Sequence, residues 1–160
     1  MPADVRLHAK GAPVSVNQAI LIYYDGSTEG KRALYRAGEM AFSPGAEIHV
    51  LAVVDVMSAI VSSAGLLSDI ACSDIVKKTW SVLDEALDHL SAKDIAACGH
   101  LGYGQVVECI ARYANLVDAD VIIIGYRLRR GLSTWWRSNR AHIELLEHAV
   151  GRAIMAVPTA

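Results

Sequence analysis

Cysteine is scarce in this sequence of 160 residues, and its three cysteines are widely spaced. Cys72, Cys98 and Cys109 form neither a CxxC redox pair nor a disulfide framework. Each lies in an apolar stretch, so we expect buried free thiols. The six histidines show no HExxH or HxH pairing, and we expect no metal site. The sequence therefore excludes a disulfide-rich scaffold and gives no sign of a metal centre.

Long hydrophobic runs are also missing. No run approaches the roughly 20 apolar residues that a transmembrane helix needs, so no membrane partner is expected. Residues 1–17 lack the apolar core of a secretion signal and are interpreted as a flexible leader. Residues 18–160 carry no linker or repeat and are expected to form one domain, with a cytoplasmic location.

Net charge is small, formally −2, which gives no strong case for nucleic-acid binding through bulk charge. The charge is nevertheless uneven. Between Tyr126 and Arg140 the chain has five arginines and no acidic residue. These arginines are Arg127, Arg129, Arg130, Arg137 and Arg140. They form either a phosphate-binding loop or a solvated surface.

Signs of catalysis are missing as well. The sequence contains no GxSxG motif, and no nucleophile has a base partner that spacing can identify. Gly102 and Gly104 match neither GxGxxG nor a Walker motif, and we expect a tight turn between a strand and a helix there. We therefore do not expect an enzyme.

What the sequence does contain is an alternation of buried strands and amphipathic helices. Strands are predicted over residues 19–24, 48–54, 94–101, 121–125 and 153–157. Helices are predicted over residues 28–40, 68–90, 105–116 and 141–149, the first of them capped by Ser27 or Thr28. In the second helix, Trp80, Leu83, Leu87 and Leu90 should face inward. The pattern predicts a three-layer α/β domain with a mainly parallel five-stranded sheet.

Ligands of such sheets bind beyond the carboxyl ends of the strands, where the strand order reverses. The segments that leave the first and fourth predicted strands are residues 25–27 and 125–139. Both contain glycine and polar side chains, and they are the predicted site.

These same segments resemble the universal stress protein family. The family typically has a strand, an Asp-Gly-Ser turn and an Arg-Ala-Leu helix, and here residues 24–34 read YDGSTEGKRAL. Residues 121–157 follow the plan of the family's second half without a gap. The resemblance implies an adenine-nucleotide-binding type of fold, a role in the stress response, and a homodimer formed through the last strand, Arg152 to Val157.

The nucleotide-binding branch of that family carries Gly-x2-Gly-x9-Gly-Ser/Thr after the fourth strand. Aligned to this chain, the motif falls on Gly125, Leu128, Ser138 and Asn139, so only its first glycine is kept. Leu128 should obstruct the usual triphosphate position, where glycine lets the backbone approach a phosphate. Ser138 and Asn139 can still offer side-chain contacts to a phosphate.

Other positions favour a retained nucleotide site. By the resemblance, Asp25 stands where the family has an acid that contacts the ribose or assists a metal, and Val53 lies in the region that borders the adenine. Arg129 and Arg130 could supply charge to a polyphosphate.

Two main hypotheses remain open, beside a third, a hydrolase or redox carrier of flavodoxin-like shape, which the residues favour less. In one, the protein acts in the stress response by self-association or partner binding, with a degraded nucleotide site. In the other, it is an ATP-binding or adenine-nucleotide-binding module whose arginines replace the glycine-loop contacts. The bulk of Tyr23 and Tyr24 could fill the base pocket and so favours the first hypothesis.

Overall fold

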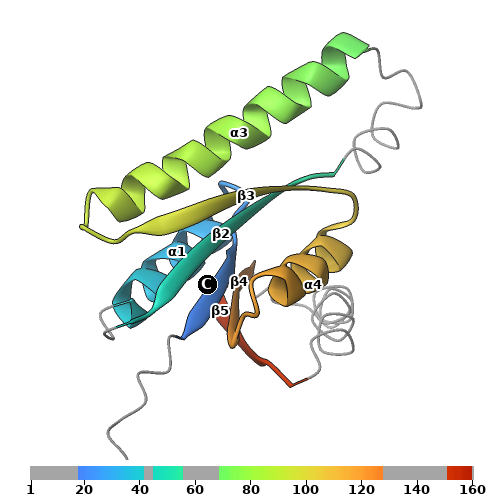
Figure 1. Ribbon diagram of the computed structural model, residues 1–160. Coiled ribbons are helices and arrows are strands. Elements are labelled where there is room, and N and C mark those ends of the chain that lie inside the picture. The colour runs from blue at the N-terminus through green and yellow to red at the C-terminus, as the bar shows by residue number, and fades with distance from the viewer. Residues whose placement is uncertain (1–17, 42–44, 56–68, 128–150, 160) are drawn as a thin grey trace, which may run out of the picture.

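The computed structural model describes residues 18–41, 45–55, 69–127 and 151–159 (Figure 1). In these ranges, five parallel strands form one sheet in the order β3-β2-β1-β4-β5. The strands are β1 (Ala19–Tyr23), β2 (Glu47–Val54), β3 (Ala97–Tyr103), β4 (Val121–Arg127) and β5 (Ala153–Thr159). The α/β prediction is confirmed. The expected leader and the expected helix over residues 141–149 lie outside the described residues.

The helices cover both faces of the sheet (Figure 1). They are α1 (Thr28–Met40), α3 (Asp69–Ser91) and α4 (Val106–Leu116). Helices α1 and α3 bury Leu34, Leu83 and Leu90 in one core cluster, whereas α4 buries Ile110 in a second cluster on the opposite face. None of the helices in the described part of the chain is long and apolar enough to span a membrane.

The central strand β1 explains why the core has two halves. Successive side chains of a strand point to opposite faces, so Ile20 and Ile22 enter the α1/α3 cluster while Leu21 enters the α4 cluster. All three side chains are completely buried. Burying such an aliphatic side chain stabilises the fold by about 1.5–3 kcal/mol, so the continuous apolar run fixes β1 in the middle of the sheet.

Three expectations from the sequence need correction. Trp80 is 48% exposed, although Leu83 and Leu90 on the predicted face are buried. In Figure 1 the N-terminal end of α3 lies farther from the sheet than its C-terminal end does. Strand β3 begins at Ala97 because Asp94 takes a left-handed conformation (φ 58°) in the turn after α3. Cys98 is exposed, since β3 is an outer strand.

The first helix begins as the sequence predicts. Ser27 is its N-cap, and the Ser27 hydroxyl accepts a hydrogen bond from the Gly30 amide at 3.0 Å. Gly26 precedes the cap with a φ of +77°, a conformation that favours glycine. The turn therefore delivers the start of α1 to the carboxyl end of β1.

Candidate functional site

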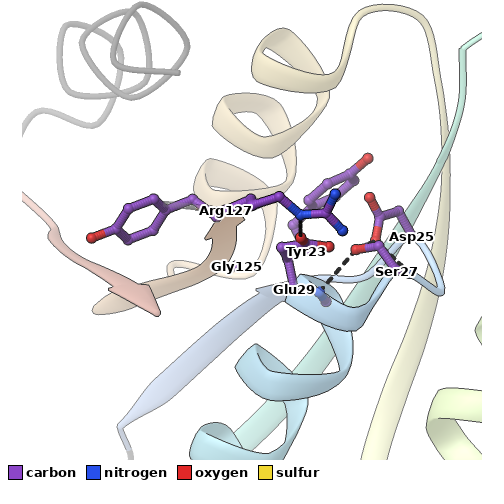
Figure 2. A pocket seen from close by; sticks show the side chains of 8 residues that line it. Tyr23, Asp25, Ser27, Glu29, Gly125 and Arg127 are labelled. Atoms are coloured by element: carbon purple, nitrogen blue, oxygen red, sulfur yellow. Dashed lines mark hydrogen bonds and ion pairs between the residues drawn. The ribbon is translucent and has the colours of Figure 1, made fainter. Parts of the chain in front are cut away.

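A crevice opens where β1 and β4 end side by side (Figure 2). Its volume is about 250 Å³. The two strands are neighbours, with Ile20 opposite Val121 and Ile22 opposite Ile123, and the chain turns into α1 after the first of them. The crevice is lined by Tyr23, Asp25, Ser27, Glu29, Gly30, Gly125, Tyr126 and Arg127. It includes residues from the start of both predicted segments, 25–27 and 125–139, and residues 128–139 lie outside the described residues.

The Asp25 side of the crevice is held by local hydrogen bonds. Oδ1 of Asp25 accepts from the Ser27 amide at 3.0 Å and from the Ser27 hydroxyl at 2.5 Å. These bonds fix the carboxylate against the turn, and both of them use the same oxygen. The carboxylate keeps further acceptor capacity on Oδ2.

The opposite side is an ion pair that the sequence analysis missed. Nε of Arg127 donates to Oε1 of Glu29 at 2.6 Å, and the Thr159 hydroxyl lies 3.3 Å from the same oxygen. The hydrogen bond from its own backbone amide, followed by the bond from Arg127, lowers the pKa of Glu29. The pairing joins residues 98 positions apart, so no local pattern could reveal it.

Arg127 spans the edge of the crevice. Its side chain is 56% exposed, whereas that of Glu29 is 14% exposed. Among the described residues, only Nε of the guanidinium has a hydrogen-bond partner, and the two terminal nitrogens have none. Figure 2 shows the guanidinium lying between Glu29 and Asp25. The group is therefore positioned to donate to a ligand.

Packing within the chain explains why a glycine stands at position 125, without any reference to a ligand. A Cβ atom at this position would lie 2.0 Å from the carbonyl oxygen of Glu29, far inside any allowed contact. The end of β4 therefore touches the first turn of α1 directly. A Cβ atom on Gly30 would in turn lie 2.8 Å from Oδ1 of Asp25. Both glycines keep the walls of the crevice close together.

The two tyrosines that follow one another at the end of β1 point to opposite faces. Tyr24 is 1% exposed, lies in the α1/α3 core cluster, and donates a hydrogen bond to Glu85 at 3.2 Å. Burial, with a smaller effect of Glu85, raises the pKa of Tyr24 to about 12. The expectation that Tyr24 fills a base pocket is wrong. Tyr23 does line the crevice, and burial followed by the charges of Asp25 and Asp55 raises its pKa.

The other predicted site residues are only partly brought together. Asp25 and Gly125 line the crevice, whereas Val53 packs against the α4 core cluster and does not line it. Arg129, Arg130, Ser138 and Asn139 lie outside the described residues. Within the described ranges, no group of three or more His, Cys, Asp or Glu side chains is placed to hold a metal ion.

A larger cavity of about 450 Å³ lies between α1 and α3. It is lined by Tyr24, Lys31, Leu34, Tyr35, Glu85, Asp88 and His89. Lys31 and Glu85 form an ion pair of 3.0 Å there. This cavity lies on the α1/α3 face of the sheet and not between the ends of β1 and β4, so its size alone does not make it the binding site of an α/β fold.

Comparison with known proteins identifies the family. The model of the universal stress protein family matches residues 17–149. The chain belongs to the universal stress protein family. No curated protein matches the sequence. The resemblance found in the sequence is therefore confirmed over most of the chain.

Solved structures of the family share the fold. A universal stress protein family member from Burkholderia pseudomallei is 24% identical, with a TM-score of 0.70 over 92% of this chain and 100% of that one. A universal stress protein in complex with cAMP is 17% identical, with a TM-score of 0.64 over 90% and 98%. The Archaeoglobus fulgidus protein in complex with dAMP is 18% identical, with a TM-score of 0.62 over 88% and 97%.

The contact of β4 with α1 yields a test on stability. In Gly125→Ala the new methyl group must displace the Glu29 backbone, so we expect the free energy of unfolding to fall by about 3 kcal/mol or more. The matched control is Gly38→Ala within α1, where the new Cβ meets only Ile95 at 3.5 Å and Leu90 at 3.9 Å. The free energy of unfolding of this control should rise by about 1 kcal/mol, because alanine has a higher helix propensity than glycine. Urea denaturation measures both changes, and equal stability of the two variants would contradict the described contact.

Proposed function

We propose that this universal stress protein binds an adenine nucleotide in the crevice between β1 and β4. The observation that carries the proposal is the open space of about 250 Å³ at the carboxyl ends of these two strands, with Asp25 on one side and Arg127 on the other. Family members in complex with cAMP and with dAMP support it. The protein would then serve the stress response as a nucleotide-responsive binding module.

The charges of the crevice assign an orientation to the ligand. Asp25 carries a negative charge on one side of the crevice, so an anionic phosphate is repelled from that side, whereas Arg127 offsets the charge of Glu29. Ribose hydroxyls are hydrogen-bond donors and suit the remaining acceptor capacity of Asp25. The phosphate is then directed to the terminal nitrogens of Arg127, because guanidinium groups bind phosphate with charge-assisted hydrogen bonds.

The size of the crevice favours a short phosphate chain. Pockets for small molecules usually measure roughly 300–1,000 Å³, and this one measures about 250 Å³. Such a space suits a nucleoside monophosphate better than a triphosphate. The replacement of the second motif glycine by Leu128 agrees with this preference.

Titration calorimetry with AMP and with adenosine tests this orientation. Arg127→Gln removes the partner of the phosphate. We therefore expect the affinity for AMP to fall about tenfold or more and the affinity for adenosine to stay unchanged. Asp25→Asn removes the negatively charged acceptor of the ribose, so it should weaken both ligands.

Arg36→Gln is the matched control for the arginine variant. Arg36 also forms a 2.6 Å ion pair with a glutamate, Glu39, but on the exposed surface of α1. This variant should bind AMP like the unmodified protein. The absence of heat at millimolar AMP, or an equal loss in both arginine variants, would contradict the proposal.

Self-association through the last strand is the second candidate. Strand β5 is the outer strand beside β4, so one of its edges has no partner in the described sheet. An unpaired edge can pair with a second copy of the chain across a two-fold axis. Arg152, at the start of the predicted interface, binds its own chain instead, through Ala119 at 2.9 Å. The candidate interface is therefore β5 itself.

Analytical ultracentrifugation tests this candidate. Ala156 is exposed on β5, and Ala156→Lys would place two like charges close together across a symmetric strand pair. We expect a dimer for the unmodified protein and a monomer for this variant at the same concentration. Tyr103→Lys, on the exposed side of the other outer strand, is the control and should remain dimeric. A dimer in both variants would rule out the β5 interface.

A further inference from the structure

Two histidines that are far apart in the sequence meet on neighbouring strands, away from the crevice. Nδ1 of His49 on β2 lies 3.1 Å from Nε2 of His100 on β3. The ring centroids are 5.3 Å apart and the planes are tilted by 35°, so the rings meet edge to edge through one hydrogen bond. In the strand register His49 is opposite Cys98, and His100 is opposite Leu51.

The pair joins the outer strand to the rest of the sheet. In the sheet formed by the described residues, strand β3 is the last strand on its side and has only β2 as a neighbour. His49 has the same side-chain direction as Leu51, two residues along, so the pair lies on the face that α4 covers. Both imidazoles are partly buried, and only 13% of the His49 side chain is exposed.

Among the described residues, few charged groups face this pair. On β2, an Oε2 atom of Glu47 lies 4.0 Å from Nε2 of His49, the nitrogen that does not face His100. On β3, the exposed thiol of Cys98 occupies the position opposite His49. From α4, the Tyr113 ring lies 5.4 Å from His100 and its hydroxyl donates to the Leu101 carbonyl. Arg112 of the same helix lies over that ring, 5.6 Å from its centroid.

The hydrogen bond between the rings accepts one added proton but not two. When both rings are neutral, one facing nitrogen donates and the other accepts. A first proton makes one ring a cation that still donates to its neutral partner. A second proton leaves an N–H on both facing nitrogens, which removes the bond and brings two partly buried positive charges together. Glu47 can offset the charge of His49 only.

We propose that His49 and His100 form an acid-sensitive latch that holds the outer strand β3 on β2 and releases it when both rings are protonated. The latch is a second feature, separate from the crevice, and it does not depend on nucleotide binding. Its opening would leave the hydrogen-bonding edge of β2 unpaired, which is a surface that can pair with another strand.

The direction in which pH changes stability follows from the surroundings of the two imidazoles. Burial, partly offset by Glu47, lowers the pKa of His49. Burial and the neighbouring His49 lower the pKa of His100. The unfolded chain therefore binds protons at a higher pH than the folded chain does. The stabilising contribution of the pair is complete above the ordinary histidine pKa, about 6.5, and is lost as the pH falls from there through the lowered values.

Amide hydrogen exchange of the full chain, with a chelator present to remove metal ions, tests the latch. We expect the protection of the β3 amides, corrected for intrinsic exchange, to fall about tenfold or more between pH 7.5 and pH 5.0, with β1 and β4 much less affected. The double variant His49→Asn/His100→Gln keeps amide groups at the facing positions, which can hydrogen-bond but do not titrate. Its β3 protection should lose most of this pH dependence.

His89→Gln on α3 is the matched control, because it removes a histidine that lies on the other face of the sheet. It should show the same acid response as the unmodified protein. The proposal is overturned if β3 protection is independent of pH, if it falls equally in the double variant, or if His89→Gln alone removes the response. A circular dichroism spectrum of each variant at pH 7.5 confirms that β3 is compared between folded proteins.

Discussion

The parallel pairing of β1 with β4 is the constraint on which the rest of the structure depends. These strands are not consecutive in the chain, yet their registers align and both end at one edge of the sheet. The chain after β1 turns into α1, whose first turn packs on β4 at Gly125 without room for a side chain. The crevice exists because these three elements meet. Its lining therefore comes from two strand ends and the first turn of a helix, which are rigid elements, as a preformed binding site requires.

The polar groups of the crevice are organised by contacts within the chain. Asp25 is held by Ser27, and Glu29 is held by Arg127 with Thr159 nearby. The Glu29 pair brings the ends of β4 and β5 to the start of α1, so it ties three elements together. It also places a guanidinium opposite the Asp25 carboxylate. A ligand with donors at one end and a negative charge at the other matches this arrangement.

The fold could be predicted from the sequence because its signals are local. The apolar run of β1 and the Ser27 cap each need only neighbouring residues. Long-range contacts left no such signal. Tyr23 and Tyr24 look equivalent in the sequence, but alternation along the strand places one in the crevice and the other in the core. The bond of Arg127 with Glu29, and that of His49 with His100, depend on the strand order, which no local pattern specifies.

The most direct test of nucleotide binding in the crevice is an amide chemical-shift titration of isotope-labelled protein with AMP. We expect the largest shifts at Asp25, Ser27, Gly30, Gly125 and Arg127, which surround the crevice. Shifts absent at millimolar AMP would contradict it. So would shifts centred on the α1/α3 cavity, which is lined by Tyr24 and by other residues of α1 and α3.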